Sequence, residues 1–385
     1  MALSSETGKV EEELLLTLAL WAESGAGDSL LRRCLGSLAR LWDGEAQRSK
    51  LLDGVSLRQR RVLLSFCEHP RSVVEAKGAQ VHKQLRTLGA RPLVLGTAEY
   101  PESLASIMDP PPVLSALGNT ALLRAATVAM VGTRSPDGLA TRACSEIVER
   151  LVTEGQLVTV SGGAVGVDAV VHASTLEHGG GTVWIAGTGL DRVYPSRNAQ
   201  LFERVAANGL VVSQFSPGTP AHRRQFPRRN FTIAALARVV IVVQASTSSG
   251  TLYTVEGARR YARPLYVLSP LAFDRGWAGG VDLLRTGAAR PLYGVEELTE
   301  ISRLCGAKPA PRPASKTRSL FGEPASRPDS MLDENARRVV EQLARRPLHQ
   351  DQFSNEIINV DATLLELELQ GIIERCPGGA IRLSR

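Results

Sequence analysis

The stretch VAMVGTRSPDGLATRACSEIVERLVTEGQLVTVSGGAVGVD, residues 128–168, decides the fold. Two short apolar runs, Val128–Val131 and Leu157–Val160, flank a segment from Ala140 to Thr153 with helical character, and a further helix is predicted from about Val165 to Glu177. Apolar runs with little alternation, separated by helices, indicate parallel strands that are buried on both faces. The stretch therefore predicts a β-α-β-α unit.

The same alternation of short apolar runs and helical segments continues toward the C-terminus. Further strands are predicted at Thr182–Ala186, Gly209–Ser213, Arg238–Val243 and Pro264–Leu268. Together they predict an α/β domain over residues 86–305, with an extended Rossmann-like, doubly wound parallel sheet.

The flanking regions are predicted to form two further domains and a linker. Residues 1–85 repeat leucines at helical spacing and predict a small helical, SAM-like domain. Residues 306–328 are rich in proline and basic residues and predict a flexible linker. Residues 329–385 predict a winged-helix domain.

The winged-helix prediction comes from three helices and a hairpin. The helices are expected at Asn335–Leu343, at Asp351–Ile358, and from an N-cap at Asp361 through Leu369. The hairpin is expected to turn at residues 377–379, which read Pro-Gly-Gly.

Such a domain is either a DNA-binding or a protein-interaction module. The third helix has Glu366 and Glu368, and residues 361–370 contain no lysine or arginine. A face of this charge is poorly suited to phosphates, so we favour protein interaction.

Composition limits the partners and the compartment. The chain has 385 residues, 43% of them hydrophobic, and a net charge of +6, which favours nucleic acid, a membrane surface or phosphorylated small molecules. No apolar run is long enough to span a bilayer, and no signal peptide is visible. The five cysteines are far apart and are expected to be reduced thiols. We therefore expect a cytoplasmic protein.

Glycine-containing turns follow the predicted strands. In a doubly wound sheet, the carboxyl ends of the strands meet at one edge, where ligands bind. Glycines that open a helix expose backbone N–H groups to an anion. These turns match neither a dinucleotide fingerprint nor a Walker A motif, and they predict a phosphate-binding rim. The turns are Gly132-Thr133-Arg134, Ser161-Gly162-Gly163, Gly187-Thr188-Gly189 and Ser249-Gly250-Thr251.

A segment without acidic residues leads to the same edge. From Arg204 to Val255 the chain has no aspartate or glutamate. The middle of this segment interleaves cations with two phenylalanines, as a single-stranded polyanion with bases requires. These residues are Arg223, Arg224, Phe226, Arg228, Arg229, Asn230 and Phe231. A solvated basic loop is the alternative reading of the segment taken alone.

Two polar residues near the second turn are expected to be structural. His172 has no nucleophile at readable spacing, and Asp168 is placed to bond backbone N–H groups at a helix start. The histidines show no metal-ligand spacing, so we expect no metal, no cofactor and no catalytic residue.

From Tyr100 to Gly287 the chain resembles the DNA-processing protein A (DprA, or Smf) family. The resemblance covers roughly half of the chain, and the order and spacing of its motifs are specific. The matching pieces are Tyr100-Pro101, Asp109-Pro110-Pro111, Gly132-Thr133-Arg134, Ser161-Gly162-x-Ala164-x-Gly166-Val167-Asp168, Gly189-Leu190-Asp191, Tyr194-Pro195, Phe226-Pro227-x-Arg229-Asn230 and Ser249-Gly250-Thr251.

The resemblance implies sequence-independent binding of single-stranded DNA. It also implies a homodimer that protects incoming DNA and loads RecA recombinase during natural transformation. Family DNA contacts carry over to Arg134, Arg229 and Asn230. With the rim and the cationic segment, the predicted DNA-binding residues are Gly132, Thr133, Arg134, Ser161, Gly162, Gly163, Arg223, Arg224, Phe226, Arg228, Arg229, Asn230, Ser249, Gly250 and Thr251.

The chain departs from the family pattern at several positions. Phe231 stands where relatives usually have an arginine, and Gln214 and Gln244 stand where acids are usual. We expect the two amides to deepen the positive potential. Ser269-Pro270 replaces the usual Pro-Gly, so the family pattern does not predict the conformation of this turn.

Two other functions remain open at this stage. A nucleotide phosphoribohydrolase would need a glutamate where this chain has Thr254, and Glu256 lies two residues too far along the helix. A pure interaction scaffold would use the N-terminal helices and the winged-helix tail.

Overall fold

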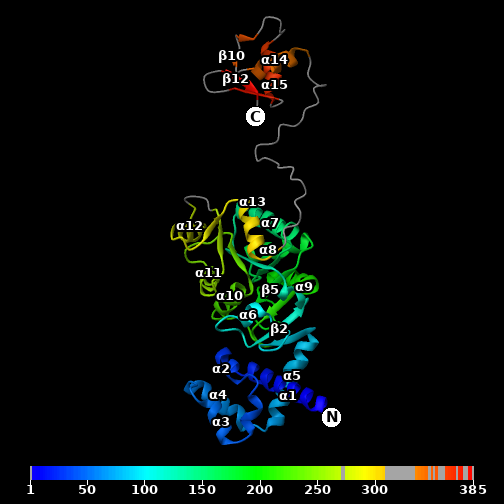
Figure 1. Cartoon of the computed structure of the whole chain (residues 1–385), viewed down its shortest axis with the longest axis vertical. Helices are drawn as coiled ribbons and strands as arrows, with labels where there is room; N and C mark the ends of the chain where they lie inside the picture. Colours follow the sequence, from blue (N-terminus) through cyan, green and yellow to red (C-terminus); the bar gives the residue numbers. More distant parts are fainter. Residues whose placement is uncertain are drawn as a thin grey trace. The chain divides into compact units, whose positions relative to one another are not determined.

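The computed structural model divides the chain into two compact units, Met1–Pro311 and Arg312–Arg385. It describes residues 2–269, 274–307, 334–345, 348–349, 352–353, 360–369, 372–375 and 380–383 (Figure 1). The linker predicted at 306–328 lies almost wholly outside the described residues, and so does Pro270 of the Ser269-Pro270 turn. Within the described part, no helix combines the length and the apolar character that crossing a membrane requires.

A nine-stranded mixed sheet is the centre of the first unit. Its order is β1-β2-β6-β5-β4-β3-β7-β8-β9, and neighbours from β6 to β9 are parallel. The strands are β1 (Ala90–Val94), β2 (Val113–Gly118), β3 (Thr127–Val131), β4 (Val158–Ser161), β5 (Thr182–Ala186), β6 (Leu210–Ser213), β7 (Val239–Val242), β8 (Leu265–Leu268) and β9 (Arg290–Leu292).

The six strands predicted from the apolar runs are confirmed as β3 to β8. The predicted doubly wound parallel sheet is confirmed from β6 to β9, and at one edge β1 and β2, which were not predicted, run antiparallel and extend the sheet beyond β6. These strands were missed because β1 contains Arg91 and Pro92, which mask its strand character. An edge strand tolerates proline because one side of its backbone needs no partner strand.

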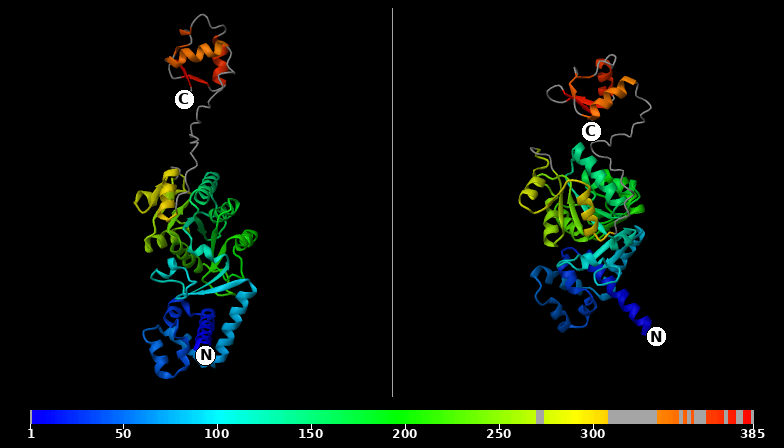
Figure 2. Two further views of the ribbon diagram at one scale, coloured as in Figure 1. Left: turned by 45° about the vertical axis from the view of Figure 1, so that its right-hand side comes forward. Right: turned by 45° about the horizontal axis from the view of Figure 1, so that its top comes forward.

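Helices cover both faces of this sheet (Figures 1 and 2). On one face, α10 and α11 pack on alternate residues of β3 and β7 such as Val131 and Val242; on the other, α7, α8 and α13 enclose Met130 and Ile241. The predicted helices in 140–153 and 165–177 are thereby confirmed. The helices are α6 (Glu102–Ala105), α7 (Gly138–Thr153), α8 (Val167–Glu177), α9 (Ala199–Asn208), α10 (Gln225–Leu236), α11 (Leu252–Arg260), α12 (Ala278–Arg285) and α13 (Val295–Leu304).

The order of the strands creates a switch point between β3 and β7. From β3 the chain proceeds through β4, β5 and β6 in one direction, then returns to place β7 on the other side of β3. The loops after these two strands therefore diverge and leave a crevice at the carboxyl edge of the sheet.

Helices precede the sheet, as predicted, and pack against it. They are α1 (Ala2–Ala22), α2 (Gly27–Cys34), α3 (Glu45–Leu52), α4 (Leu57–Glu68) and α5 (Arg71–Thr87). Their apolar core, which includes Leu16 and Leu20, is continuous with Trp184 and Phe202 of the sheet region. Trp21 Nε1 also donates to the Gln214 carbonyl oxygen at 3.2 Å.

The second unit has the elements expected of a winged helix. The described elements are α14 (Glu334–Arg345), α15 (Val360–Leu369), β10 (Leu348–His349), β11 (Ile373–Arg375) and β12 (Ala380–Leu383). β12 pairs antiparallel with both β10 and β11. The helix predicted at 351–358 and the turn at 377–379 lie largely outside the described residues, and Asp361 lies within α15 rather than at its N-cap.

Candidate functional site

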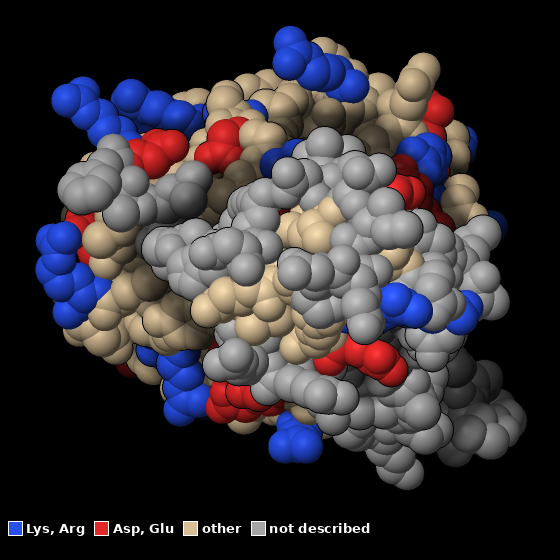
Figure 3. Space-filling view, turned by 90° about the horizontal axis from the view of Figure 1, so that it is seen from above, with Lys and Arg blue, Asp and Glu red and all other residues tan. Residues whose placement is uncertain are grey.

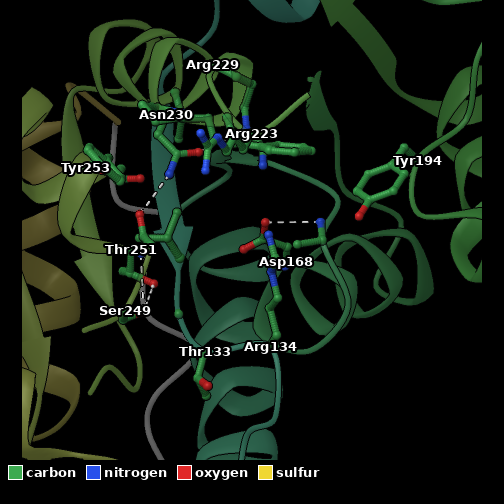
Figure 4. A pocket seen from close by; sticks show the side chains of 18 of the residues that line it. Thr133, Arg134, Asp168, Tyr194, Arg223, Arg229, Asn230, Ser249, Thr251 and Tyr253 are labelled. Atoms are coloured by element: carbon green, nitrogen blue, oxygen red, sulfur yellow. Dashed lines mark hydrogen bonds between the residues drawn. The ribbon is translucent and has the colours of Figure 1, made fainter. Parts of the chain in front are cut away.

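An open pocket of about 950 Å³ lies at the switch point, beyond the carboxyl ends of β3 and β7 (Figure 4). Most of the predicted site residues meet there, although they come from three separate segments of the chain. Those that line it are Gly132, Thr133, Arg134, Arg223, Arg224, Phe226, Arg229, Asn230, Ser249, Gly250 and Thr251.

The other predicted residues lie elsewhere. Ser161 is fully buried and donates its Oγ hydrogen to the Met130 carbonyl at 2.7 Å, so it is a strand-end residue without access to a ligand. Gly163 is packed against the Trp184 ring, where a Cβ would collide. Gly162 lines a smaller adjoining cavity of about 110 Å³. Arg228 Nη2 bonds Asp28 Oδ2 of α2 at 2.6 Å, outside the pocket lining.

Three arginines present free cations to the pocket. Arg134, Arg223 and Arg224 are exposed, and they form no ion pair with the part of the chain that the structure describes. The β3–α7 loop that holds Arg134 is fixed from below by Gly166, whose φ of +85° and missing side chain let Val167 N donate to Thr133 O at 3.1 Å. The cation therefore stands on a rigid turn.

Arg229 is different, because it is 5% exposed and forms part of the pocket floor. Its Nη1 donates to the carbonyl oxygens of Gly162 and Ile185, the latter at 2.8 Å, and its Nε donates to Asn230 Oδ1 at 3.0 Å. Burial lowers the pKa of Arg229, and Asp168 opposes that shift. Much of the hydrogen-bonding capacity of Arg229 is therefore used to hold two strand ends together, and its contact with DNA stays a prediction.

Asp168 has the structural role that the sequence suggested. Its Oδ2 accepts a hydrogen bond from Ala164 N at 3.2 Å, which closes the turn before α8 (Figure 4). Burial raises the pKa of Asp168, and the charge of Arg229 works in the opposite direction. The negative charge of this carboxyl group offsets part of the effect of burial on the Arg229 cation. Gly162 lies against both side chains, and a Cβ there would collide with the Arg229 guanidinium and with Asp168 Oδ2.

His172 is also structural. It is fully buried, with Nδ1 at 2.7 Å from Thr182 Oγ1, and its ring is stacked on Trp184 at 5.0 Å between centroids. Burial lowers the pKa of His172 to about 3, with a smaller contribution from Arg229. The imidazole is therefore neutral at physiological pH and does not reach the pocket lining.

The two phenylalanines of the cationic segment differ. Phe226 lies over Gly187, within 5.5 Å of the Tyr194 ring and 5.8 Å of the Arg229 guanidinium, and lines the pocket. Phe231 is half-buried, packs edge-on against the Tyr261 ring and lies outside the lining. Of the two phenylalanines, Phe226 is therefore the one that can offer its ring to a ligand in the pocket.

Tyr194, Tyr253 and Thr254 line the pocket but were absent from the predicted set. Tyr194 lies in the Tyr-Pro motif quoted above, and Tyr253 follows the Ser-Gly-Thr turn by two residues. Helical spacing could have revealed Tyr253 and Thr254, because the second and third residues of α11 lie beside the turn that opens it. Figure 4 shows the two tyrosines on opposite sides of the pocket, with Arg134 and Arg223 between them.

The two glutamines that replace acids are buried, each 4% exposed. Gln244 Nε2 donates to Asp137 Oδ2 at 2.7 Å, and Thr232 Oγ1 donates to Gln214 Oε1. Their direct effect is therefore on hydrogen bonds at strand ends. The predicted effect of the two amides on the pocket potential stays a prediction.

The basic character of the pocket is local. The face drawn in Figure 3 has red acidic side chains among the blue basic ones. In contrast, Asp168 is the one acid among the described residues that line the pocket, and it is buried. The described residues include no group of three or more histidines, cysteines or acids that could hold a metal ion.

Sequence comparison identifies two family matches. The family described as DNA recombination-mediator protein A matches residues 91–303, and the DprA winged helix domain matches residues 323–379. Protein Smf from Synechocystis sp. is 32% identical over 306 residues, which are 73% of this chain and 77% of that protein. DNA processing protein DprA from Streptococcus pneumoniae is 36% identical over 201 residues, which are 52% of this chain and 71% of that protein.

Two solved structures are similar to this one. DNA processing protein A from S. pneumoniae has a TM-score of 0.63 at 27% identity, and the match covers 73% of this chain and 95% of that chain. DNA processing protein A from Helicobacter pylori, described for its single-stranded DNA binding mode, has a TM-score of 0.51 at 28% identity, covering 55% of this chain and 96% of that one.

Proposed function

Because this chain belongs to the DNA recombination-mediator protein A family, we propose that its pocket binds single-stranded DNA without reading the base sequence. One observation is central to the proposal. Arg134, Arg223 and Arg224 are exposed around one pocket and form no ion pair in the described part of the chain. Unpaired guanidinium groups on a rigid rim are suited to phosphates spaced along a flexible strand.

Helix N-termini add to the attraction. α8, α10 and α11 each begin beside the pocket, and none has a side-chain N-cap. Their dipoles favour negative charge at this edge, although the first N–H group of each helix already donates to an oxygen of the preceding turn or of Thr133. Since a helix dipole belongs to the backbone, it attracts phosphate whatever the base.

Phe226 and Tyr194 supply the stacking surface. Their rings lie beside each other on one wall, and the Arg229 guanidinium supports the Phe226 ring from the floor. Stacking on an aromatic ring contributes about 1–3 kcal/mol per base and accepts any base, because every base has a π-face. This wall holds the strand without selecting its sequence.

We also propose the cellular role that the family resemblance implies. A cytoplasmic homodimer protects incoming single-stranded DNA and transfers it to RecA recombinase during natural transformation, without itself catalysing a reaction. Membership of a recombination-mediator family supports this part of the proposal. It is tested by measuring RecA filament formation on DNA coated with single-strand-binding protein, with and without this protein.

The phosphoribohydrolase alternative receives little support from the geometry. Glu256 is exposed, lies 3.6 Å from Arg259 and does not line the pocket, while Thr254 occupies the wall. Release of adenine from AMP checks it directly. If the wild type released adenine and Glu256→Gln did not, the protein would be a hydrolase and the binding proposal would be wrong.

Fluorescence anisotropy on the full chain tests the binding proposal. We expect a labelled oligothymidine to bind more tightly than a duplex of equal length, and its affinity to fall as salt rises. Equal affinity for the two ligands, or no binding at all, would contradict the proposal.

A further inference from the structure

The wall of the pocket formed by the start of α11 has features that phosphate binding alone does not use. Tyr253 is 50% exposed and lies across the pocket from Tyr194 (Figure 4). We propose that this wall is a second nucleotide subsite, in which Tyr253 stacks on one nucleobase and Thr254 bonds the sugar-phosphate of the same nucleotide. The inference rests on the proposed single-stranded DNA binding and adds a site to it.

Thr254 gives the observation that points to a ligand. It is 1% exposed, it lines the pocket, and its Oγ1 has no hydrogen-bond partner among the described residues. Buried hydroxyl groups in folded proteins nearly always have a partner. A phosphate or sugar oxygen in the pocket would supply one.

The turn before Thr254 is already held in place. Ser249 Oγ accepts from Thr251 N at 3.2 Å and donates to Thr251 Oγ1 at 2.9 Å, and Asn230 Nδ2 donates to Gly250 O at 3.0 Å. Asn230 thereby ties α10 to the start of α11. A fixed turn makes the ring of Tyr253 and the hydroxyl of Thr254 available at little cost in ordering on binding.

The arrangement of the two walls suggests how a strand lies. Phe226 and Tyr194 form one wall and Tyr253 the other, while Arg134 and Arg223 lie between them (Figure 4). A strand whose backbone follows the arginines can direct one base to each wall. Single strands allow this because their bases are not paired, whereas a duplex keeps its bases stacked inside.

The test uses the full chain, a labelled oligothymidine and an oligonucleotide of the same length with every base removed. We expect Tyr253→Ala to weaken oligothymidine binding by roughly 5- to 150-fold and to leave binding of the abasic strand unchanged. Tyr253→Phe should bind both like the wild type. Tyr293→Ala is the matched control, because Tyr293 is 73% exposed and lies outside the pocket lining.

Thr254→Val checks the other half of the subsite. It keeps the shape of the side chain and removes the hydroxyl, so we expect both the oligothymidine and the abasic strand to bind about two- to tenfold more weakly. Unchanged binding of both strands would remove Thr254 from the subsite.

The outcomes separate the two proposals. Wild-type binding of oligothymidine with no loss in Tyr253→Ala overturns the second subsite and leaves the proposed function standing. An equal loss on the abasic strand also overturns it, since the ring would then act on something other than a base. No binding of oligothymidine by the wild type overturns the proposed function itself.

Discussion

The rim of the pocket and its floor use the same residue type in opposite ways. Arg223 and Arg229 are six positions apart on one acid-free segment. Arg223 is exposed on the rim, whereas Arg229 is buried in the floor, with bonds to the Gly162 and Ile185 carbonyls. The difference teaches that a cationic cluster in a sequence can combine ligand-binding residues with residues that build the site.

The start of α10 separates the two groups. Arg223 and Arg224 precede the helix, where side chains point into solvent, while Arg229 lies one turn inside it. Within the helix, one face packs on the sheet, so a residue at that spacing points inward. Arg228, next to it, points away and pairs with Asp28.

The largest expected effect concerns the floor. Arg229→Ala removes the donors to two buried carbonyls and the cation near Asp168, and we expect it to lower the free energy of unfolding by about 3–5 kcal/mol. Urea unfolding followed by tryptophan fluorescence measures this for the first unit alone, because Trp21, Trp42, Trp184 and Trp277 all belong to it.

Arg223→Ala is the control for that comparison. Since the side chain is exposed, its loss should change the free energy of unfolding by less than about 0.5 kcal/mol. Equal destabilisation by the two variants would remove the distinction between rim and floor.

The next effect, which accumulates gradually as the pH falls, tests the buried neutral side chain of His172. The pKa of His172 is about 3 in the folded chain against an ordinary 6.5, so the unfolded chain takes up the proton first as pH falls. The contribution of neutral His172 to the free energy of unfolding is therefore complete above pH 6.5. It is lost as the pH falls toward 3, at up to about 1.4 kcal/mol per pH unit.

His172→Gln should flatten that pH dependence between pH 6 and pH 4, as measured by urea unfolding at each pH. His69→Gln, which changes an exposed side chain, should keep the wild-type slope. An unchanged slope in His172→Gln would mean that another group titrates.

The smallest expected effect distinguishes two exposed arginines, Arg223 and Arg228, by their contribution to oligothymidine binding. Arg223→Ala should weaken oligothymidine binding by about fivefold, because one charged hydrogen bond to phosphate is lost. Arg228→Ala should change it by less than about twofold, because that guanidinium is paired with Asp28 outside the pocket. Anisotropy titrations at one salt concentration compare the two, and a reversed order would place the strand on the wrong side of α10.

Much of the fold followed from the sequence because its signals are local. The six apolar runs became β3 to β8, and the turns after them met at one edge because parallel strands end on the same side. The antiparallel strands β1 and β2 were missed, since Pro92 and the prolines at 110–112 look like breaks when the edge of the sheet is unknown.

The sequence predicted which residues form the site better than it predicted where their side chains point. Residue type and spacing identified Arg134, Arg223 and Phe226 as pocket residues. They did not show that Ser161 bonds Met130 within the sheet or that Arg228 pairs with Asp28, because these contacts join segments distant in sequence. Tyr253 was missed because the prediction ended at Thr251 and did not extend to the first turn of the helix that follows.

Arg134 provides the most direct test of the central claim, that exposed arginines on a rigid rim bind the phosphates of single-stranded DNA. Oligothymidine affinity is measured by anisotropy across a salt series for the wild type and Arg134→Ala. We predict weaker binding by Arg134→Ala and a slope of log affinity against log salt that is smaller by about 0.7, the value for one phosphate contact on a single strand. An unchanged affinity and slope would contradict the account.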